Sequence, residues 1–321
     1  MKRSLQLLGA VFALSIVGAA SAQTWPTKTI RVVVPFTPGS GTDIIARSIT
    51  DKLAIALGQA IVVDNRAGAG STIGAAMVAK ADPDGYTILV NSSSHTVAPH
   101  TYSNLPYDTL RDLTGITPLA ALPNVLIIAP SKGIKNVQEL VALAKSKPGS
   151  LNYASAGQGS ATHLNAERFR LAAGFEGTHI PFKGTPEAVT EVIAGRVDVY
   201  FCPVVSALSH LKDGKVLALA VGSPKRSSAL PDVQTTLEAG FANSDYTFWV
   251  GMFVPSKTPK EIMARLYQET NKALALPDVR ERLTKLGAEP MPMNAGEFDA
   301  FIRKEVGANG PLIKAAGVKG N

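Results

Sequence analysis

Two segments far apart in the sequence combine glycines with small hydroxyl residues where an apolar strand meets an amphipathic helix. The first is Pro35–Asp43 (PFTPGSGTD) and the second is Ser155–His163 (SAGQGSATH). A turn from a strand into a helix leaves backbone N–H groups unpaired at the positive end of the helix dipole, which favours an anion. Two such sites suggest one anionic ligand held between two lobes.

Glycines in the first segment permit both the turn and the start of a helix. Gly39 and Gly41 allow conformations in which successive N–H groups converge. We expect Thr42 to cap the helix, Asp43 to lie in its first turn, and Arg47 to pair with Asp43 four residues later. These roles make Asp43 structural rather than a ligand contact. A plain turn from strand to helix, with no ligand, is the competing interpretation.

Gly157 and Gly159 give the second segment the same backbone freedom. Three hydroxyl side chains that can donate to a carboxylate belong to this segment: Ser155, Ser160 and Thr162. His163, early in the following helix, is either a ligand contact or a residue that caps or packs. Each hydrogen bond to a charged group contributes roughly 1.5–3 kcal/mol, so several such donors could bind a carboxylate without an arginine.

Two further polar loops follow predicted strands and could close the same site. Asn91–His95 (NSSSH) carries several hydroxyl groups. Pro181–Pro186 (PFKGTP) leads into a helix, for which we expect Thr185 as the cap and Pro186 as the first helical residue. Lys183 is the only fixed cation in these loops, and its side chain either reaches the ligand or points to solvent.

The sequence lacks the signatures of common enzymes and cofactor sites. Gly68–Gly74 (GAGSTIG) places its last glycine one residue too late for a dinucleotide-binding fingerprint. There is no G-x-x-x-x-G-K-[ST] phosphate loop and no G-x-S-x-G nucleophile elbow. The five histidines do not have the spacing of metal ligands on one helix. We therefore expect no enzyme, no cofactor and no metal site.

The first 22 residues have the pattern of a secretory signal peptide. Lys2 and Arg3 form a basic start, Leu5–Ala20 is apolar, and Ala20-Ser21-Ala22 is a cleavage motif of the A-x-A type. The apolar stretch is short and rich in small residues, so an uncleaved membrane anchor is the less favoured interpretation. We expect export to the periplasm with cleavage after Ala22.

The composition fits an exported globular protein with two domains. About 300 mature residues suffice for a large core. Cys202, as the lone cysteine, cannot form an internal disulfide, and we expect it to be a buried, unreactive thiol after the apolar run that precedes it. The formal net charge is +7, or +5 without Lys2 and Arg3, and the basic residues are scattered, which disfavours nucleic-acid binding.

Strand and helix signals alternate along the mature chain, which predicts α/β lobes with largely parallel sheets. Strands are expected at Ile30–Pro35, Ile61–Asn65, Thr87–Asn91, Val125–Ala129, Thr178–Pro181, Val197–Phe201, Val216–Val221 and Phe248–Pro255. Helices are expected at Asp43–Leu57, Thr72–Lys80, Val137–Lys145, Ala161–Ala173, Thr185–Ala194, Val205–Leu211, Lys260–Leu276, Pro277–Leu286 and Gly296–Glu305. We place lobe 1 at residues 23–122 and 246–321 and lobe 2 at residues 123–245, so that two chain crossings form a hinge.

An ordered set of short motifs resembles the solute receptors of tripartite tricarboxylate transporters, also called the Bug family. The motifs are Pro35-Phe36 through Asp43, Asn65-Arg66 through Gly74, Pro83 through Thr87, Tyr153 through His163, Phe182-Lys183-Gly184, Gly195 through Asp198, and Leu230 through Val233. The resemblance covers essentially the whole mature sequence. It implies the two-lobed type II fold of periplasmic binding proteins (the Venus flytrap), which binds small organic acids in the cleft between the lobes.

The resemblance also identifies the two glycine-rich segments as the gripping loops of that cleft. The ligand contacts that it implies are Phe36, Thr37, Gly39, Ser40, Gly41, Ala156, Gly157, Gln158, Gly159 and Ser160, with Ser92, Ser93, Lys183 and Gly184 lining the same cleft. Ser40 departs from the family pattern, in which a second glycine commonly follows Gly39. Ala67 stands where proline often follows the arginine. These departures leave the identity of the ligand open.

The sequence therefore predicts a monomeric periplasmic protein that captures a small carboxylate and delivers it to the membrane subunits of a transporter. A ligand-responsive sensor that docks a receptor kinase needs the same lobe closure and is the alternative. A hydrolase or lyase on the same fold is a third hypothesis, against which the lack of an acid/base pair argues. The sequence does not distinguish mono-, di- and tricarboxylates, amino acids and aromatic acids.

Overall fold

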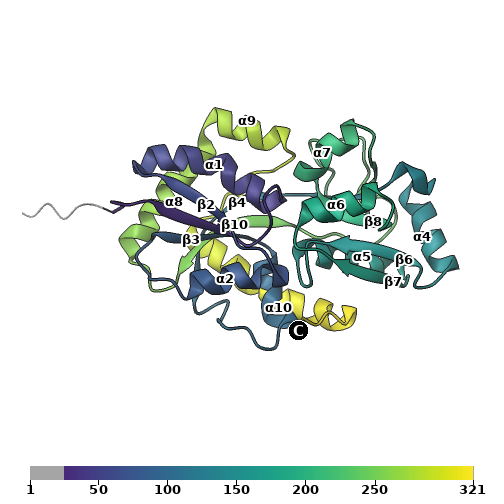
Figure 1. The fold of residues 1–321 in the computed structure, drawn as a ribbon, viewed down its shortest axis with the longest axis horizontal. Coiled ribbons are helices and arrows are strands. Elements are labelled where there is room, and N and C mark those ends of the chain that lie inside the picture. Colours follow the sequence, from purple (N-terminus) through teal and green to yellow (C-terminus); the bar gives the residue numbers. More distant parts are fainter. Residues whose placement is uncertain (1–24, 321) are drawn as a thin grey trace, which may run out of the picture.

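Alternating strands and helices form two α/β lobes that lie side by side, each built around a five-stranded sheet (Figure 1). This computed structural model describes residues 25–320. The predicted signal peptide, residues 1–22, lies outside the described residues. Within residues 25–320, each helix is too short or too polar to span a bilayer.

Lobe 1 combines the first part of the described chain with its last three helices. Its strands, in the sheet order β2-β1-β3-β10-β4, are β1 (Ile30–Val34), β2 (Ile61–Asn65), β3 (Thr87–Ser92), β4 (Leu113–Ala121) and β10 (Trp249–Pro255). Its helices are α1 (Gly41–Leu57), α2 (Thr72–Ala79), α3 (Ser94–Thr101), α8 (Lys260–Ala275), α9 (Pro277–Lys285) and α10 (Ala295–Ala316), with a short 3-10 turn at Ala69–Ser71. α1, α8 and α9 cover one face of the sheet, whereas α2 and α10 cover the other (Figure 1).

Lobe 2 is formed by the middle of the chain. Its strands, in the sheet order β7-β6-β8-β5-β9, are β5 (Asn124–Ile128), β6 (Leu151–Ser155), β7 (Gly177–Pro181), β8 (Val199–Pro203) and β9 (Leu217–Val221). Its helices are α4 (Val137–Ser146), α5 (Ala161–Ala173), α6 (Thr185–Ile193) and α7 (Val204–Lys212), with a 3-10 turn at Pro130–Lys132. α4 and α5 share one apolar core with the sheet, and α6 and α7 share a second.

Both sheets are mixed, but in each of them four of the five strands run in the same direction, in agreement with the expectation of largely parallel sheets. β1 pairs in parallel with β2 and β3, and β6 pairs in parallel with β7 and β8. β10 and β5 instead pair antiparallel with both of their neighbours. These are the strands by which the chain enters each lobe after crossing from the other, so they run opposite to the strands that end at the lobe interface. The two crossings form the expected hinge.

The buried cores explain why the predicted elements form. On α1, Ile45, Ile49 and Leu53 recur at helical spacing and are fully buried in the core of lobe 1. Each residue of β5 is buried, as its continuous apolar sequence indicates. Cys202 lies in a core of lobe 2, where burial raises the pKa of its thiol, so the prediction of a buried thiol is confirmed.

Most element bounds agree with the sequence predictions to within two residues. The last helix is the main exception, because α10 continues to Ala316 through Pro311. α6 is capped by Gly184 and begins at Thr185, so the expectations of Thr185 as the cap and of Pro186 as the first helical residue are both wrong by one residue. The Thr185 hydroxyl lies 3.0 Å from the Tyr200 hydroxyl instead of bonding to the backbone of its own helix. The sequence predicts neither β4 nor α3.

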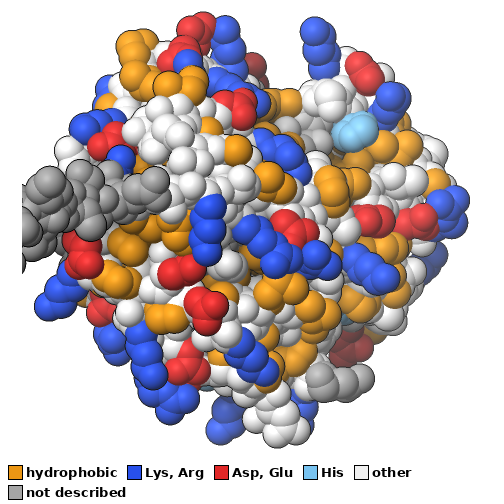
Figure 2. All heavy atoms as spheres, turned by 60° about the vertical axis from the view of Figure 1, so that its left-hand side comes forward, with side chains coloured by type: hydrophobic (Ala, Val, Ile, Leu, Met, Phe, Trp, Pro, Cys, Tyr) orange, Lys and Arg blue, Asp and Glu red, His pale blue; other side chains and the backbone are white. Residues whose placement is uncertain are grey.

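Charged side chains are spread over the molecular surface. Figure 2 shows Lys and Arg side chains interspersed with Asp and Glu side chains and with apolar side chains on one face. This mixture of both signs agrees with the scattered positions of the basic residues in the sequence.

Candidate functional site

The N-termini of α1, α5 and α6 lie at one small pocket between the lobes, and Ser94, the first residue of α3, also lines it. α1 reaches it from lobe 1, and α5 and α6 reach it from lobe 2. This inner pocket is lined by Phe36, Ser40, Gly41, Thr42, Ser92, Ser94, Ala156, Ser160, Ala161, Thr162, Thr185, Pro203 and Phe248. Its volume is about 10 Å³, which is about the room that one water molecule needs. The lining contains hydroxyl groups and backbone but no acidic side chain.

Unpaired backbone donors make the inner pocket attractive to an anion. The N–H groups of Gly41 and Thr42, in the first turn of α1, have no acceptor among the described residues, and the same holds for Thr162 on α5 and Thr185 on α6. Three helix dipoles add positive potential at the same point. The sequence predicted that two helix N-termini, those of α1 and α5, face one ligand, and the structure adds the N-terminus of α6.

Loop 1 (Pro35–Ser40) is held in place by Asp43. One carboxylate oxygen of Asp43 accepts the N–H of Gly39 at 2.9 Å, and the other accepts the side-chain amide of Asn65 at 2.9 Å. Arg47 donates to the same carboxylate at 3.0 Å, and the Asn65 amide also donates to the Phe36 carbonyl at 3.0 Å. The expected pairing of Asp43 with Arg47 is confirmed. Asp43 therefore shapes the loop and does not line the inner pocket.

The cap of α1 differs from the prediction. Ser40, not Thr42, is the cap, because its hydroxyl accepts the N–H of Asp43 and thereby starts the helix two residues earlier. Thr42 instead lines the inner pocket in the first helical turn. From the sequence, the hydroxyl of either Ser40 or Thr42 could cap the helix, and the sequence does not indicate which of the two does so.

Loop 2 (Ala156–Ser160) is fixed by side chains behind it. The Ser155 hydroxyl donates to the Gly157 carbonyl at 3.0 Å and accepts the Gly157 N–H at 3.1 Å. Since its single proton is used there, Nε2 of His179, 2.6 Å away, is the donor of their shared hydrogen bond. Nδ1 of His163 accepts the N–H of Gly159 at 3.1 Å. His163 thus supports the loop from inside the lobe.

Burial keeps both of these histidines neutral. Their rings stack 3.7 Å apart at an angle of 8°. Burial lowers the pKa of each to about 3, with the charge of Arg170 lowering that of His163 further. A neutral His163 keeps Nδ1 free to accept, which the loop requires. Glu167, buried one helical turn further on, pairs with Arg170 at 2.7 Å and accepts from the Tyr153 hydroxyl.

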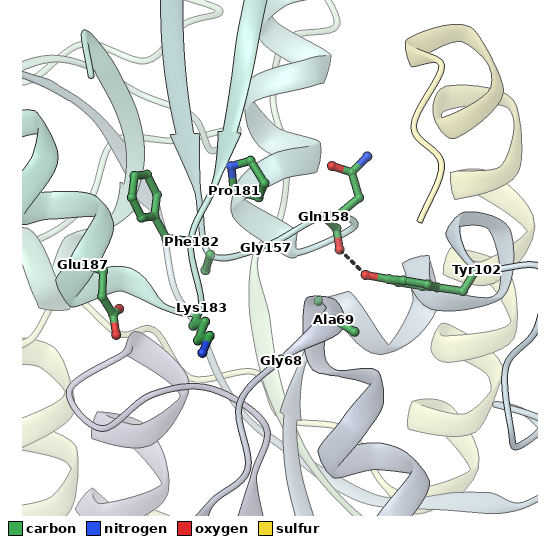
Figure 3. A pocket seen from close by; sticks show the side chains of 11 residues that line it. Gly68, Ala69, Tyr102, Gly157, Gln158, Pro181, Phe182, Lys183 and Glu187 are labelled. Atoms are coloured by element: carbon green, nitrogen blue, oxygen red, sulfur yellow. Dashed lines mark hydrogen bonds between the residues drawn. The ribbon is translucent and has the colours of Figure 1, made fainter. Parts of the chain in front are cut away.

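A larger outer pocket adjoins the inner one at Ala156. Its volume is about 410 Å³, and its lining is Gly68, Ala69, Gly70, Tyr102, Ala156, Gly157, Gln158, Pro181, Phe182, Lys183 and Glu187 (Figure 3). Lys183 and Glu187 supply the one cation and the one anion of this lining. Both side chains extend from lobe 2 toward the loops of lobe 1 (Figure 3).

Direct contacts join the lobes around the two pockets, so this is a closed conformation. The Thr37 hydroxyl donates to Glu187 at 3.3 Å, and the Ala161 N–H donates to the Ser94 hydroxyl at 2.9 Å. Glycines permit the approach. A Cβ on Gly184 would lie 1.8 Å from Oγ1 of Thr37 in the opposite lobe.

The structure brings most of the predicted site residues to the lobe interface. Those that line the inner pocket are Phe36, Ser40, Gly41, Ser92, Ala156 and Ser160, and those that line the outer pocket are Ala156, Gly157, Gln158 and Lys183. Thr37, Gly39, Gly159 and Gly184 lie where the lobes touch, whereas Ser93 lines neither pocket.

Sequence reasoning missed several lining residues of these pockets. Ser94 and Thr185 stood in loops that the sequence had singled out, so their hydroxyl groups were a usable signal. Gly70 belonged to a glycine-rich segment considered only for dinucleotide binding. Tyr102 and Pro203 gave no local signal, because only the tertiary fold brings them to the cleft.

Comparison with known proteins identifies the family. Residues 45–318 match the tripartite tricarboxylate transporter family receptor. The chain is 34% identical to Protein BugT of Bordetella pertussis strain Tohama I, over 99% of either protein. Its fold is that of R. palustris Rpa4515 with adipate (31% identity, TM-score 0.88, 92% of this chain and 99% of that one). The fold is also similar to that of MatC (Rpa3494) from Rhodopseudomonas palustris with bound malate (34% identity, TM-score 0.85, 90% of this chain and 99% of that one).

These similarities confirm the expected two-lobed fold of periplasmic binding proteins. The matching family and the similar structures are binding proteins, not enzymes, in agreement with the prediction from the sequence.

Proposed function

Because the chain belongs to the receptor family of the tripartite tricarboxylate transporters, we propose that it captures a small carboxylate between its lobes and delivers it to a membrane transporter of that type. The mature protein then begins at Gln23, after cleavage behind Ala22, and acts in the periplasm as a monomer. Lobe 1 comprises residues 23–122 and 246–321, and lobe 2 comprises residues 123–245.

The convergence of unpaired N–H groups on the inner pocket is the observation that carries this proposal. Gly41, Thr42, Thr162 and Thr185 offer donors from three helix termini, and no acidic side chain competes for them. Each such bond to a carboxylate is worth roughly 1.5–3 kcal/mol, and helix dipoles add roughly 0.3–1 kcal/mol each. A carboxylate therefore recovers its lost hydration without an arginine.

The size of the inner pocket indicates that binding is coupled to lobe movement. About 10 Å³ is far too little for a whole organic acid. The lobes must open at the hinge, admit the ligand and close on it, so that the ligand stabilises the closed form by its differential affinity. The similar proteins carry malate and adipate, both dicarboxylates. A second carboxylate would extend into the outer pocket, toward Lys183.

The proposed ligand contacts are the loop residues named from the sequence. They are Phe36, Thr37, Gly39, Ser40 and Gly41 in lobe 1, Ala156, Gly157, Gln158, Gly159 and Ser160 in lobe 2, and Ser92, Ser93, Lys183 and Gly184 at the edges of the cleft. Phe36, which is buried in the inner pocket, supplies an apolar wall for the carbon chain.

A thermal-shift screen of the ligand-stripped mature protein tests the proposal. Mono-, di- and tricarboxylates, amino acids and aromatic acids are compared at equal concentrations. A bound acid raises Tm in proportion to the logarithm of its excess over Kd. We expect small dicarboxylates such as malate or adipate to give the largest shifts. If no carboxylate shifts Tm and calorimetry detects no binding, the proposed function is wrong.

Lys183→Met then tests the orientation of the ligand. Removing this ammonium group is expected to weaken a dicarboxylate more than a monocarboxylate of the same chain length, because only the dicarboxylate reaches the outer pocket. Lys212→Met, on the exposed side of α7, is the matched control. Equal losses for both ligand classes would contradict the orientation but not the function.

A further inference from the structure

A second set of contacts between the lobes surrounds Gln158 and lies outside the inner pocket. The Tyr102 hydroxyl, from the end of α3 in lobe 1, donates to the Gln158 carbonyl at 2.9 Å. The Gln158 side-chain amide donates in turn to the Lys319 carbonyl of lobe 1 at 3.2 Å. Figure 3 shows the Tyr102 ring extending toward the main chain of Gln158. Lobe 1 therefore holds loop 2 through both the backbone and the side chain of Gln158.

On the lobe 1 side of this contact, the Tyr102 ring is fixed by the C-terminal segment 317–320. The segment 317–320 follows α10 and is anchored by the buried Val318. Gly320 forms a β-bridge with Tyr102 and donates its N–H to the Thr101 carbonyl at 2.8 Å. A Cβ on Gly320 would lie 2.2 Å from Cε1 of Tyr102, so the ring packs directly on the backbone. Tyr102 is thereby oriented before the lobes meet.

The backbones of the two lobes lie in contact with each other at Gly70 and Gly157, with no side chain between them. A Cβ on Gly70 would lie 2.0 Å from the Gln158 carbonyl oxygen and 3.2 Å from the Tyr102 hydroxyl. A Cβ on Gly157 would lie 3.3 Å from the nitrogen of Gly70. Only glycine at position 70 leaves the Gln158 carbonyl within reach of Tyr102. The contact exists in the closed conformation alone, because its partners lie in different lobes.

We propose that Tyr102 is a positioning residue which, together with Gly70 and the segment 317–320, latches Gln158, holds the lobes closed and slows release of the ligand. The inference rests on the proposed function for its ligand kinetics but not for the closed state of the free protein. Tyr102 lines the outer pocket but not the inner one, and its hydroxyl donates to the Gln158 carbonyl, so it does not contact the carboxylate held in the inner pocket. Burial raises the pKa of Tyr102 to about 12, which keeps its hydroxyl a donor at any pH at which the protein works.

The kinetic test replaces the hydroxyl alone. In Tyr102→Phe the closed form loses one hydrogen bond, and we expect the dissociation rate of malate or adipate to rise by about 2- to 10-fold. The association rate should stay equal or rise, because the ligand-free variant is open more often than the parent protein. Tyr107→Phe is the matched control, because the Tyr107 hydroxyl is buried in lobe 1 without a hydrogen-bond partner. Equal dissociation rates for Tyr102→Phe, Tyr107→Phe and the parent protein would overturn the latch.

A structural test needs no ligand and separates this proposal from the proposed function. Gly70→Ala places a methyl group in the way of Gln158. Gly58→Ala is the matched control, because Gly58 has a similar positive φ (+69°, against +58° at Gly70) and its Cβ would have no neighbour within 4 Å. Small-angle scattering of the ligand-free proteins should give a larger radius of gyration for Gly70→Ala and Tyr102→Phe than for the parent protein and Gly58→Ala. If the parent is as expanded as Gly70→Ala, the latch does not hold the free protein closed and is refuted. A protein that binds no carboxylate yet shows the expected expansion would refute the function and leave the latch supported.

Discussion

Gly184→Ala is the sharpest test of the closed geometry, because it adds one methyl group where the lobes touch. Gly184 has φ −172°, an extended backbone that any residue adopts, so alanine introduces no local strain. The new Cβ would lie 1.8 Å from Oγ1 and 2.9 Å from Cβ of Thr37 in the opposite lobe. Both lobes can fold with this methyl group, but they cannot meet as they do here.

The expected magnitude follows from the overlap. Carbon and oxygen atoms in ordinary contact lie roughly 3.5 Å apart, so the loops at Gly184 and Thr37 must separate by roughly 1.5 Å or Thr37 must rotate. Overpacking of this kind costs about 1–3 kcal/mol, which corresponds to a loss of affinity of about 5- to 150-fold. In the absence of ligand the loss in the free energy of unfolding is limited to the free energy of opening the lobes, because the clash disappears once they open.

Isothermal titration calorimetry with the strongest ligand of the screen measures this loss. Thr37→Gly removes the atoms that the methyl group meets, although it also removes the hydrogen bond to Glu187. We expect the double variant to bind about as well as Thr37→Gly alone, so that the two changes are strongly non-additive. Gly307→Ala, with no neighbour within 4 Å of its Cβ, is the neutral control. Unchanged affinity in Gly184→Ala, or a double variant that binds worse than both single variants, would refute the reasoning.

Three further predictions concern the supports of the site. Asp43→Ala removes the carboxylate that accepts from the Gly39 N–H group, from Nε of Arg47 and from the Asn65 amide. It should lower the free energy of unfolding by about 1–3 kcal/mol in urea titrations. His163 and His179 have a folded pKa of about 3 against 6.5 for the free side chain, so the unfolded chain binds protons that the folded chain does not. Their contribution to stability is complete above about pH 6.5 and is lost as the pH falls toward 3, at about 1.4 kcal/mol per pH unit for each histidine, and His163→Gln should reduce this slope between pH 4 and 6. Cys202, whose thiol pKa is raised by burial, should react with Ellman's reagent only after denaturation, and rapid reaction of the native protein would contradict its burial.

Local patterns sufficed wherever one segment determines its own structure. The turn from β1 into α1 was predictable because Gly39 and Gly41 permit the turn and the apolar residues after Asp43 recur at helical spacing. The choice of Ser40 over Thr42 as the cap was not, since both hydroxyls suit that role. What decides it is the carboxylate of Asp43, which accepts the Gly39 N–H and thereby sets where the helix begins.

Structure that depends on distant partners escaped the sequence. β4 contains Gly115 and Pro118, which weaken a strand prediction. In the fold, however, a Cβ on Gly115 would lie 2.8 Å from the Phe298 ring, so the glycine makes room for α10. The same helix continues through Gly310 and Pro311 because it packs on α3, with the His100 ring 3.1 Å from the Cβ position of Gly310. Neither neighbour can be inferred from the local sequence.

The hydrogen bonds of loop 2 change the role expected of its glycines. The sequence predicts that Gly157 and Gly159 expose N–H groups to the ligand, yet these groups donate to Ser155 and His163. The donors that stay unpaired belong to the first helical turns, such as Thr42 and Thr162. The glycines instead allow the two lobes to approach to main-chain distance. Closure and anion recognition therefore depend on different atoms of the same loops, so substitutions can weaken either one while the other is kept.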